Sequence, residues 1–193
     1  RKAKAPSVPL SHYVIFFSIA ILGLATDLIT KTWMFSNLGM PGDQPTWWLW
    51  QNVFGFQTAL NEGALFGMGQ GRGIVFITLS LVAVAGVSYW LFVAGGAADR
   101  WLTIALGGVM AGTLGNLYDR LGMPGLKWNY HAERIGEPVY AVRDFILFQC
   151  PWFDWPNFNI ADSLLVVGAF MLAVHAFLYQ EAPSTATQAS VAK

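Results

Sequence analysis

Four long apolar stretches constrain this chain more than any other feature. They occupy about residues 13–33, 74–94, 101–117 and 160–178. A helix needs about 20 mostly apolar residues to cross the hydrocarbon core of a bilayer, and each stretch approaches or reaches that length. A soluble protein of 193 residues rarely needs four such segments. We therefore predict an all-α membrane protein built as a four-transmembrane-helix bundle.

The composition agrees with a membrane-embedded chain. Hydrophobic residues make up 55% of the sequence and charged residues only 11%, whereas a typical soluble domain has about 25% charged residues. Eleven basic residues balance eleven acidic ones, so no basic excess is available to bind nucleic acid. The single cysteine, Cys150, cannot form an internal disulfide, and the three histidines lack the spacing of metal ligands. We expect no metal and no cofactor.

The basic residues near the start predict how the chain crosses the membrane. Three of the first four residues are basic, which favours a cytoplasmic N-terminus. The first span is longer than the apolar region of a cleaved signal peptide and contains Asp27, so we expect it to be retained. With four spans the C-terminus is also cytoplasmic. Residues 1–180 then form a single membrane domain, and residues 181–193 form a small, polar, disordered tail.

The two long connections, about residues 34–73 and 122–159, are expected outside the cytoplasm. The first contains three tryptophans within the segment Trp47–Trp50, and such rings favour the membrane interface. From Phe54 the sequence alternates roughly between apolar and polar residues and then becomes rich in glycine. We predict a small extracytoplasmic β-cradle or loop region lying on the membrane. A simple interfacial anchor is the alternative.

Charged and amide side chains gather at the outer ends of these spans. Ionisable residues in membrane segments are costly and are therefore candidates for function. The candidates are Asp27, Lys31, Asn116, Asp119, Arg120, Asp144, Asn159 and Asp162. In the predicted topology all of them can converge on one outward-facing pocket.

Several candidates also have a structural interpretation. Asp27 and Lys31 have the i,i+4 spacing of a helix ion pair. Asn116 and Asp119 share a helix face, and we favour a role in holding a neighbouring loop. Arg120 suits the negative end of a helix dipole, although it could also bind a carbonyl.

Two further short patterns have a structural interpretation. Asn159 and Asp162 have the spacing of an N-cap and an acidic first turn, which would explain Asp162 without catalysis. Gly108 and Gly112 form a GxxxG pair, which favours close packing of helices over ligand binding.

A pair of carboxylates is what favours chemistry at this pocket. Two carboxylates that share one site cannot both ionise cheaply, so one keeps its proton. The ionised group can take a proton from water, and the protonated group can hydrogen-bond the scissile carbonyl of a peptide. The spacing alone leaves open which of Asp119, Asp144, Asp154 and Asp162 form the pair.

Five motifs in this order carry a family resemblance. They are TDLITK (Thr26–Lys31), NEGALFG (Asn61–Gly67), GNLYDR (Gly115–Arg120), VRDF (Val142–Phe145) and FNIADS (Phe158–Ser163). Together, against four spans, they resemble the bacterial lipoprotein signal peptidases, signal peptidase II, over about residues 13–179. The resemblance implies an aspartyl endopeptidase of the bacterial inner membrane. It would remove the signal peptide of a prolipoprotein by cleaving before a diacylglyceryl-modified cysteine, near the extracytoplasmic face.

The resemblance also implies roles for individual residues. It makes Asp144 and Asp162 the catalytic pair. The residues that would line or brace the site are Asn61, Gly63, Asn116, Asp119, Arg120 and Asn159, together with Asp27 and Lys31. The implied partners are the lipid-modified prolipoprotein and the surrounding membrane lipid. The antibiotic globomycin would inhibit by occupying the site.

Two departures from the family pattern affect the outer region. A long insert, residues 121–143, separates Arg120 from Asp144 where the usual link is much shorter. The sequences of the segments Trp47–Trp50 and Ala64–Gly71 also differ from the usual family pattern, so the contacts between the substrate and the cradle are left open. Asp154 is an additional carboxylate that we interpret as interfacial.

Two other functions compete with proteolysis. A small transporter or proton-coupled carrier would also use carboxylates within spans, but it is disfavoured because the charges gather at one end and no inverted repeat is evident. A non-enzymatic assembly subunit would use the carboxylates to hold helices together. Incubation with a lipidated precursor separates the three interpretations.

Overall fold

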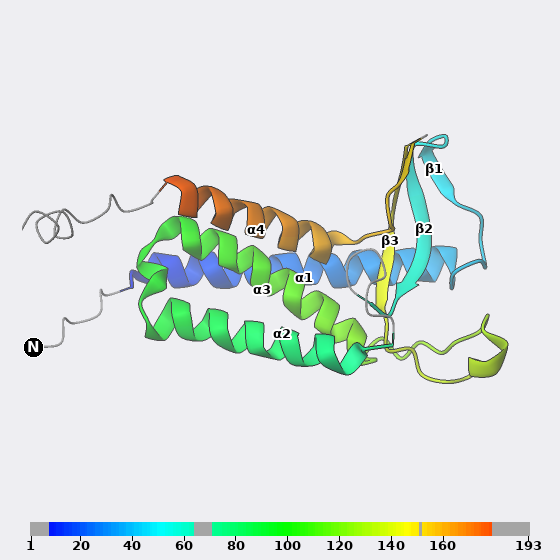
Figure 1. Ribbon diagram of the computed structural model, residues 1–193, viewed down its shortest axis with the longest axis horizontal. Helices are drawn as coiled ribbons and strands as arrows, with labels where there is room; N and C mark the ends of the chain where they lie inside the picture. The colour runs from blue at the N-terminus through cyan, green and yellow to red at the C-terminus, as the bar shows by residue number, and fades with distance from the viewer. Residues whose placement is uncertain (1–7, 64–70, 151, 179–193) are drawn as a thin grey trace, which may run out of the picture.

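Long helices lie side by side in the computed structural model, and a small antiparallel sheet stands at one end of the bundle (Figure 1). The structure describes residues 8–63, 71–150 and 152–178. The helices are α1 (Leu10–Leu38), α2 (Gly73–Ser88), α3 (Arg100–Arg120) and α4 (Ile160–Leu178). Shorter turns are η2 (Tyr89–Val93), which continues α2, η3 (Gly96–Ala98) and η4 (Ala132–Arg134). Helices thus cover each of the four predicted apolar stretches.

Three of these helices are long and apolar enough to cross a membrane. Within the described residues they are α1, α2 together with η2, and α4. Their outward faces carry exposed aliphatic and aromatic side chains, such as Ile21 on α1, Val82 on α2 and Phe170 on α4. Lipid is the solvent that suits such a surface, so the chain is an integral membrane protein. The predicted count of four spans is supported only in part, because α3 falls outside this group.

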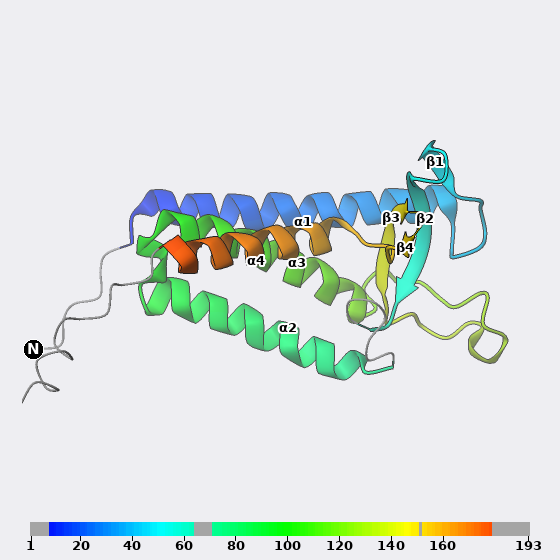
Figure 2. The same ribbon diagram turned by 45° about the horizontal axis from the view of Figure 1, so that its top comes forward.

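Helix α3 differs from the others because it is the centre of the bundle. It packs against α1, α2 and α4, and Figure 2 shows it between α1 and α2. Glycines replace larger apolar residues along it, at positions 107, 108, 112 and 115, and its last turns carry Asn116 and Asp119. This composition lowers the mean hydropathy of α3 but lets its neighbours approach closely.

The glycines of α3 show how close that approach is. A Cβ added at Gly112 would collide with the carbonyl oxygen of Ala161 and lie 2.8 Å from Cγ of Leu165, both on α4. A Cβ at Gly108 would meet the carbonyl oxygen of Leu164 at an ordinary 3.6 Å. Both members of the GxxxG pair therefore face α4, as expected for helix packing, but only Gly112 is strictly required by space.

The sheet has four antiparallel strands in the order β1-β2-β3-β4. They are β1 (Trp47–Trp50), β2 (Phe54–Asn61), β3 (Val142–Cys150) and β4 (Phe153–Asp154). The predicted small sheet is therefore present, with the tryptophan-rich segment as its edge strand. Asp144 was expected in a loop but lies in β3, where it pairs with Ala59 of β2. This long-range pairing has no signature in the local sequence.

Two apolar clusters fix the sheet to α1 and the insert to the sheet. Phe145 of β3 packs with Met34 and Leu38 of α1. The 121–143 insert leaves the end of α3, folds back on itself and buries Trp128 and Val139 near Leu60 of β2. The predicted tail, residues 181–193, and residues 64–70 lie outside the described residues.

Candidate active site

Asn159 connects the two aspartates of the proposed pair. Asp144 comes from β3 and Asp162 from the first turn of α4. The side-chain amide of Asn159 donates to Oδ1 of Asp144 at 2.6 Å. Asn159 also caps α4: its Oδ1 accepts from the Asp162 backbone N–H at 2.9 Å, and its own N–H donates to Asp162 Oδ2 at 3.2 Å. This reciprocal capping satisfies two backbone donors and fixes Asp162 beside the strand.

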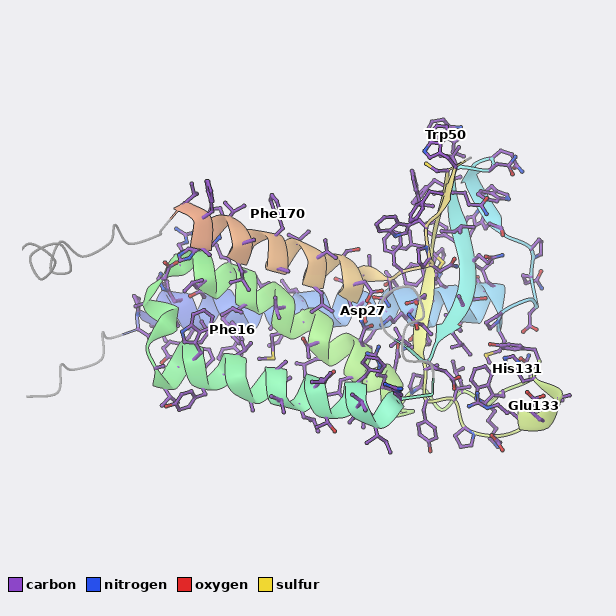
Figure 3. All side chains as sticks on the ribbon, in the orientation of Figure 1. Phe16, Asp27, Trp50, His131, Glu133 and Phe170 are labelled. Atoms are coloured by element: carbon purple, nitrogen blue, oxygen red, sulfur yellow. The ribbon has the colours of Figure 1, made fainter. Side chains whose placement is uncertain are left out.

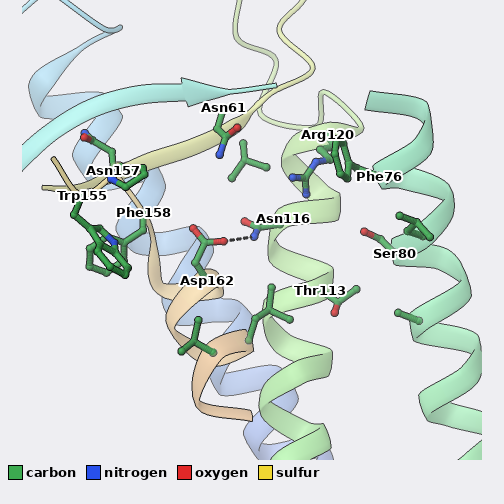
Figure 4. Close-up of a pocket in the computed structure, with 16 residues that line it drawn as sticks. Asn61, Phe76, Ser80, Thr113, Asn116, Arg120, Trp155, Asn157, Phe158 and Asp162 are labelled. Atoms are coloured by element: carbon green, nitrogen blue, oxygen red, sulfur yellow. Dashed lines mark hydrogen bonds between the residues drawn. The ribbon is translucent and has the colours of Figure 1, made fainter. Parts of the chain in front are cut away.

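Asn116 of α3 holds the same pair from the opposite side. Its Nδ2 donates to Oδ1 of Asp162 at 2.8 Å (Figure 4). Its Oδ1 accepts from Asn159 at 3.2 Å and from Nζ of Lys31 at 3.0 Å. Both oxygens of Asp162 therefore accept hydrogen bonds, as suits an ionised carboxylate.

A buried ion network lies beneath the aspartate pair. Lys31 Nζ lies 2.8 Å from Oδ2 of Asp27 and 3.0 Å from Oδ2 of Asp119, and all three side chains are fully buried. Charges removed from water in this way are stable only when they are paired with good geometry. Asp27 also accepts from the backbone N–H of Ala161 at 2.9 Å, which joins α1 to the start of α4.

Asp119 braces strand β3. Its Oδ1 accepts from Nε of Arg143 at 2.9 Å, and its Oδ2 accepts from the Arg143 backbone N–H at 3.1 Å. Arg143 directly precedes Asp144, so these bonds set where Asp144 lies. The favoured interpretation, in which Asp119 holds a neighbouring segment, agrees with this geometry. Arg143 was not among the predicted site residues, although its place inside the VRDF motif was a usable signal.

Burial makes Asp144 the protonated member of the pair at neutral pH. Desolvation, followed by the nearby charge of Asp162, raises the pKa of Asp144 from its ordinary value of 3.8 to about 8. Hydrogen bonds from Asn159 and Asn61 and the charge of Lys31 act in the opposite direction but are weaker. The site thus holds Asp144 as a carboxylic acid beside Asp162.

A cavity of about 360 Å³ opens beside Asp162, between α2, α3 and α4 and under the sheet (Figure 4). Its polar wall includes Asn61, Asn116 and Arg120, and its apolar wall includes Phe76 and Leu165. Asp162 is the one carboxylate among the described residues that line it, while Asp144 is 2% exposed behind this wall. The volume is that of a small-ligand pocket, and its two walls suit a ligand with mixed apolar and polar character.

Arg120 closes one side of this cavity. Its Nη2 donates to the carbonyl oxygen of Gly63 at 2.9 Å, and its guanidinium lies 5.2 Å from the ring centre of Phe76. Arg120 lies in the last turn of α3, where it suits the helix dipole, and it also binds a carbonyl. It holds the end of β2 over the site.

Comparison with known proteins decides the family. Residues 19–178 match the family Signal peptidase (SPase) II. The chain belongs to the signal peptidase II family. A lipoprotein signal peptidase of Rhodopirellula baltica is 44% identical over 186 residues, covering 94% of this chain and 79% of that protein. One of Clostridium novyi is 34% identical over 164 residues, covering 84% of this chain and 96% of that protein.

Solved structures share the fold of this signal peptidase II. A bacterial membrane enzyme structure at 1.9 Å resolution has a TM-score of 0.69 and 21% sequence identity, covering 93% of this chain and 99% of that chain. A second, at 2.3 Å resolution, also has a TM-score of 0.69 and covers 88% of this chain. The family assignment confirms the resemblance given by the five motifs.

The signal peptidase II fold brings together all the site residues predicted from the sequence. Asp144, Asn159 and Asp162 form the upper layer, with Asn61, Gly63 and Arg120 above the cavity. Asp27, Lys31 and Asp119 form the buried ion network, and Asn116 links this network to Asp162. Asp154 lies in β4, and its side chain falls outside the described part of the chain. Sequence reasoning did not find the cavity residues of α2, Phe76 and Ser80, because an apolar helix gives no local sign of which face meets a ligand.

Proposed function

We propose that this signal peptidase II is an intramembrane aspartyl endopeptidase. It removes the signal peptide of a prolipoprotein by cleaving before a diacylglyceryl-modified cysteine, and Asp144 and Asp162 are its catalytic residues. The observation that carries the proposal is the pairing of a buried, protonated Asp144 with a hydrogen-bonded Asp162 at the wall of a cavity. The family relation supports a protease, and it does not support a transporter or a non-enzymatic subunit.

The two aspartates take complementary roles in this reaction. Asp162 accepts a proton from a water molecule as the water oxygen bonds to the scissile carbonyl carbon. The protonated Asp144 hydrogen-bonds the carbonyl oxygen and passes its proton to that oxygen as negative charge develops there, and it takes the proton back when the C–N bond breaks. The C–N bond then breaks as the leaving amine takes the proton from Asp162. The products are a signal peptide with a new carboxyl end and a lipoprotein with a free amino-terminal cysteine.

The placement of the site in the membrane is part of the proposal. The chain crosses the bacterial inner membrane four times, because α3 is counted as a span in addition to α1, α2 and α4. Residues 1–180 form one domain. The start of α1 and the end of α4 lie at the same end of the bundle, opposite the sheet (Figure 1). Basic residues before α1 favour a cytoplasmic position for that end. The sheet, the insert and the aspartates then face outward, where the lipid anchor of the substrate lies in the outer leaflet.

A labelling experiment tests this orientation. Glu133 lies in the insert at the end of the molecule that carries the sheet (Figure 3), and its side chain is exposed. A cysteine at position 133, in a Cys150→Ala background, should react with a membrane-impermeant reagent added outside intact spheroplasts. A cysteine at Arg100, at the opposite end, should not react. The reverse pattern would invert the orientation.

Cleavage of a lipidated precursor by purified protein tests the catalytic assignment. General acid–base catalysis contributes roughly 10²–10⁴-fold, so Asp144→Asn and Asp162→Asn should each lose cleavage by about that factor or more. Asp43→Asn is the control, because Asp43 is an exposed carboxylate on the same outer side and lies outside the site. Near-normal cleavage by folded Asp144→Asn or Asp162→Asn protein would refute the assignment.

Substrate and inhibitor specificity follow from the same proposal. The precursor is presented by its lipid, so an unmodified precursor should be cleaved much more slowly than a diacylglyceryl-modified one. Globomycin should block cleavage, and it should protect the Cys150→Ala protein against thermal unfolding, since a ligand that binds only the folded state stabilises it. Equal turnover of the two precursors would remove the lipid from recognition.

A further inference from the structure

Three consecutive residues at the end of β2 are each held by a different part of the molecule. Asn61 lines the cavity and hydrogen-bonds the side chain of Asp144. Glu62 forms an ion pair with Arg134 of the insert, with 2.9 Å between Oε1 and Nη1. The carbonyl of Gly63 accepts from Arg120. The segment that places Asn61 over the aspartates therefore has an anchor in the 121–143 insert.

The insert has the internal structure that an anchor needs. Backbone bonds close it into a loop: Trp128 N–H donates to Glu137 O at 3.0 Å, and Gly136 N–H donates to Trp128 O at 2.9 Å. Trp128 is 3% exposed and packs near Leu60, so the loop is fixed to β2 itself. The segment between Trp128 and Glu137, which contains Arg134, is therefore joined to β2 through Trp128.

Arg134 is the residue through which the insert reaches Glu62. Its guanidinium stacks on the ring of buried Trp128 at 4.3 Å from the centroid. Stacking and a partly shielded ion pair hold a guanidinium in one orientation better than either interaction alone. The other acidic neighbour, Glu137, is 3.7 Å away and 59% exposed, so solvent weakens that contact.

The link from Arg134 to the catalytic pair is short. Glu62 directly follows Asn61, so a restraint on the Glu62 side chain restrains the backbone from which Asn61 projects. Asn61 closes its own turn, since its Oδ1 accepts from the Gly63 N–H at 3.0 Å. Figure 4 shows Asn61 at the edge of the cavity, above Asp162 and Asn116. Movement of this turn would withdraw Asn61 from the site.

We propose that Arg134, acting through Glu62, is a positioning residue for cleavage, and that the 121–143 insert exists in this chain to hold Asn61 against the catalytic pair. This inference rests on the proposed function. It gives the insert a role in the rate of the chemical step and not only in folding. Arg134 touches neither the reacting atoms nor the cavity wall.

Arg134→Gln and Glu62→Gln test the proposal by steady-state kinetics on a lipidated precursor. Contacts outside a site change its energetics modestly, so kcat should fall by about 3- to 10-fold while KM stays nearly constant. The double variant should be no slower than either single variant, because both remove the same interaction. Glu137→Gln is the matched control, since it removes the other acidic neighbour of Arg134, and it should keep the kcat of the unaltered protein. Arg134→Lys should recover part of the loss.

The pH profile distinguishes positioning from a loss of folded protein. The Asn61 hydrogen bond lowers the pKa of Asp144, so loss of that bond should move the alkaline limb of the kcat profile to higher pH. Arg134→Gln and Glu62→Gln should show this shift, and Glu137→Gln should not. A purely structural insert would lower the amount of folded enzyme and leave the limb where it is, which would overturn the inference.

Two reference measurements separate this inference from the proposed function. The unaltered protein and Asp144→Asn are assayed with the same precursor. If the unaltered protein does not cleave, or Asp144→Asn still does, the proposed function fails. If both behave as expected but Arg134→Gln keeps an unchanged kcat and pH profile, only the role of the insert fails.

Discussion

Lys31 and Asn116 meet across 85 positions of sequence, with Nζ of Lys31 donating to Oδ1 of Asn116 at 3.0 Å in the buried interior. An amide presents an acceptor on one side and donors on the other. Because the oxygen of Asn116 faces the ammonium group, its Nδ2 must face Asp162. A cation outside the proposed catalytic pair therefore sets which end of the Asn116 amide meets Asp162.

The first prediction concerns this cation. Lys31→Met removes the charge that pairs with Asp27 and Asp119 while keeping an apolar chain of similar length. Breaking a buried ion pair from one side costs about 3–5 kcal/mol, because the remaining charge is left unpaired in a poor solvent. We expect a large fall in the unfolding temperature in detergent, together with loss of cleavage.

A second change in the same network provides the control. Asp27→Asn keeps an oxygen that can accept from the Ala161 N–H but removes the carboxylate that Lys31→Met leaves unpaired, whereas Asp119 keeps its ion pair with Arg143. The double variant, Lys31→Met with Asp27→Asn, should therefore be more stable than Lys31→Met alone. A double variant that is less stable would show that burial of unpaired charge is not the cause.

The second prediction is a pH dependence of cleavage. Asp144 has a pKa raised to about 8 by burial and by the charge of Asp162. It must stay protonated to donate to the substrate carbonyl, so kcat should fall as pH rises through about 8. Initial rates measured with buffers from mildly acidic to strongly alkaline pH show this fall in kcat. A rate that is flat through pH 8 would contradict a protonated Asp144, and the apparent value belongs to the coupled pair.

The third prediction is the effect of the same group on folding. Asp144 is protonated in the folded protein up to about pH 8 but ionises near its ordinary value of 3.8 when unfolded. Folding takes up a proton between these limits, so the contribution of Asp144 to stability is present below 3.8 and is lost as pH rises toward 8. Asp144→Asn should therefore gain stability relative to the unaltered protein as pH rises from 5 to 8. Thermal unfolding of both proteins across this range, in one detergent, measures the difference.

The fourth prediction compares the two positions of the proposed catalytic pair. An amide mimics a protonated acid, so Asp144→Asn should fold normally. At Asp162 both oxygens accept hydrogen bonds, from Asn116 and from the Asn159 N–H, and an amide can accept at only one. Asp162→Asn should therefore be destabilised by about 1–2 kcal/mol through its weakened cap, in addition to its lost activity. Equal unfolding temperatures of the two variants at neutral pH would contradict this asymmetry.

The fifth prediction uses the two glycines of α3 that face α4. Gly112→Ala forces a methyl group against Ala161 and Leu165, while Gly108→Ala places it at an ordinary distance from Leu164. Overpacking of this kind costs about 1–3 kcal/mol, and it would push away the end of α4 that carries Asp162. Gly112→Ala should lose both stability and kcat, while Gly108→Ala should keep both. Equal effects would mean that α4 yields easily at this point.

Short-range patterns made several features predictable from the sequence alone. Twenty or so consecutive apolar residues specify a helix in lipid whatever the rest of the chain does, because the backbone must satisfy its own hydrogen bonds there. The cap formed by Asn159 and Asp162 and the ion pair of Asp27 with Lys31 span only three or four residues. Their geometry is that of the helix itself, so the spacing in the sequence determines it.

Contacts between distant segments were decided only by the tertiary structure. Asp144 lies in a strand because β3 pairs with β2, and Arg143 meets Asp119 because α3 ends beside that strand. The ion pair of Arg134 with Glu62 joins residues 72 positions apart. No local spacing encodes such contacts, since they depend on how helices of similar apolar character pack. For the same reason spacing alone left open which of the carboxylates at one end of the bundle form a pair, and it was the family resemblance of the motifs that named Asp144 and Asp162.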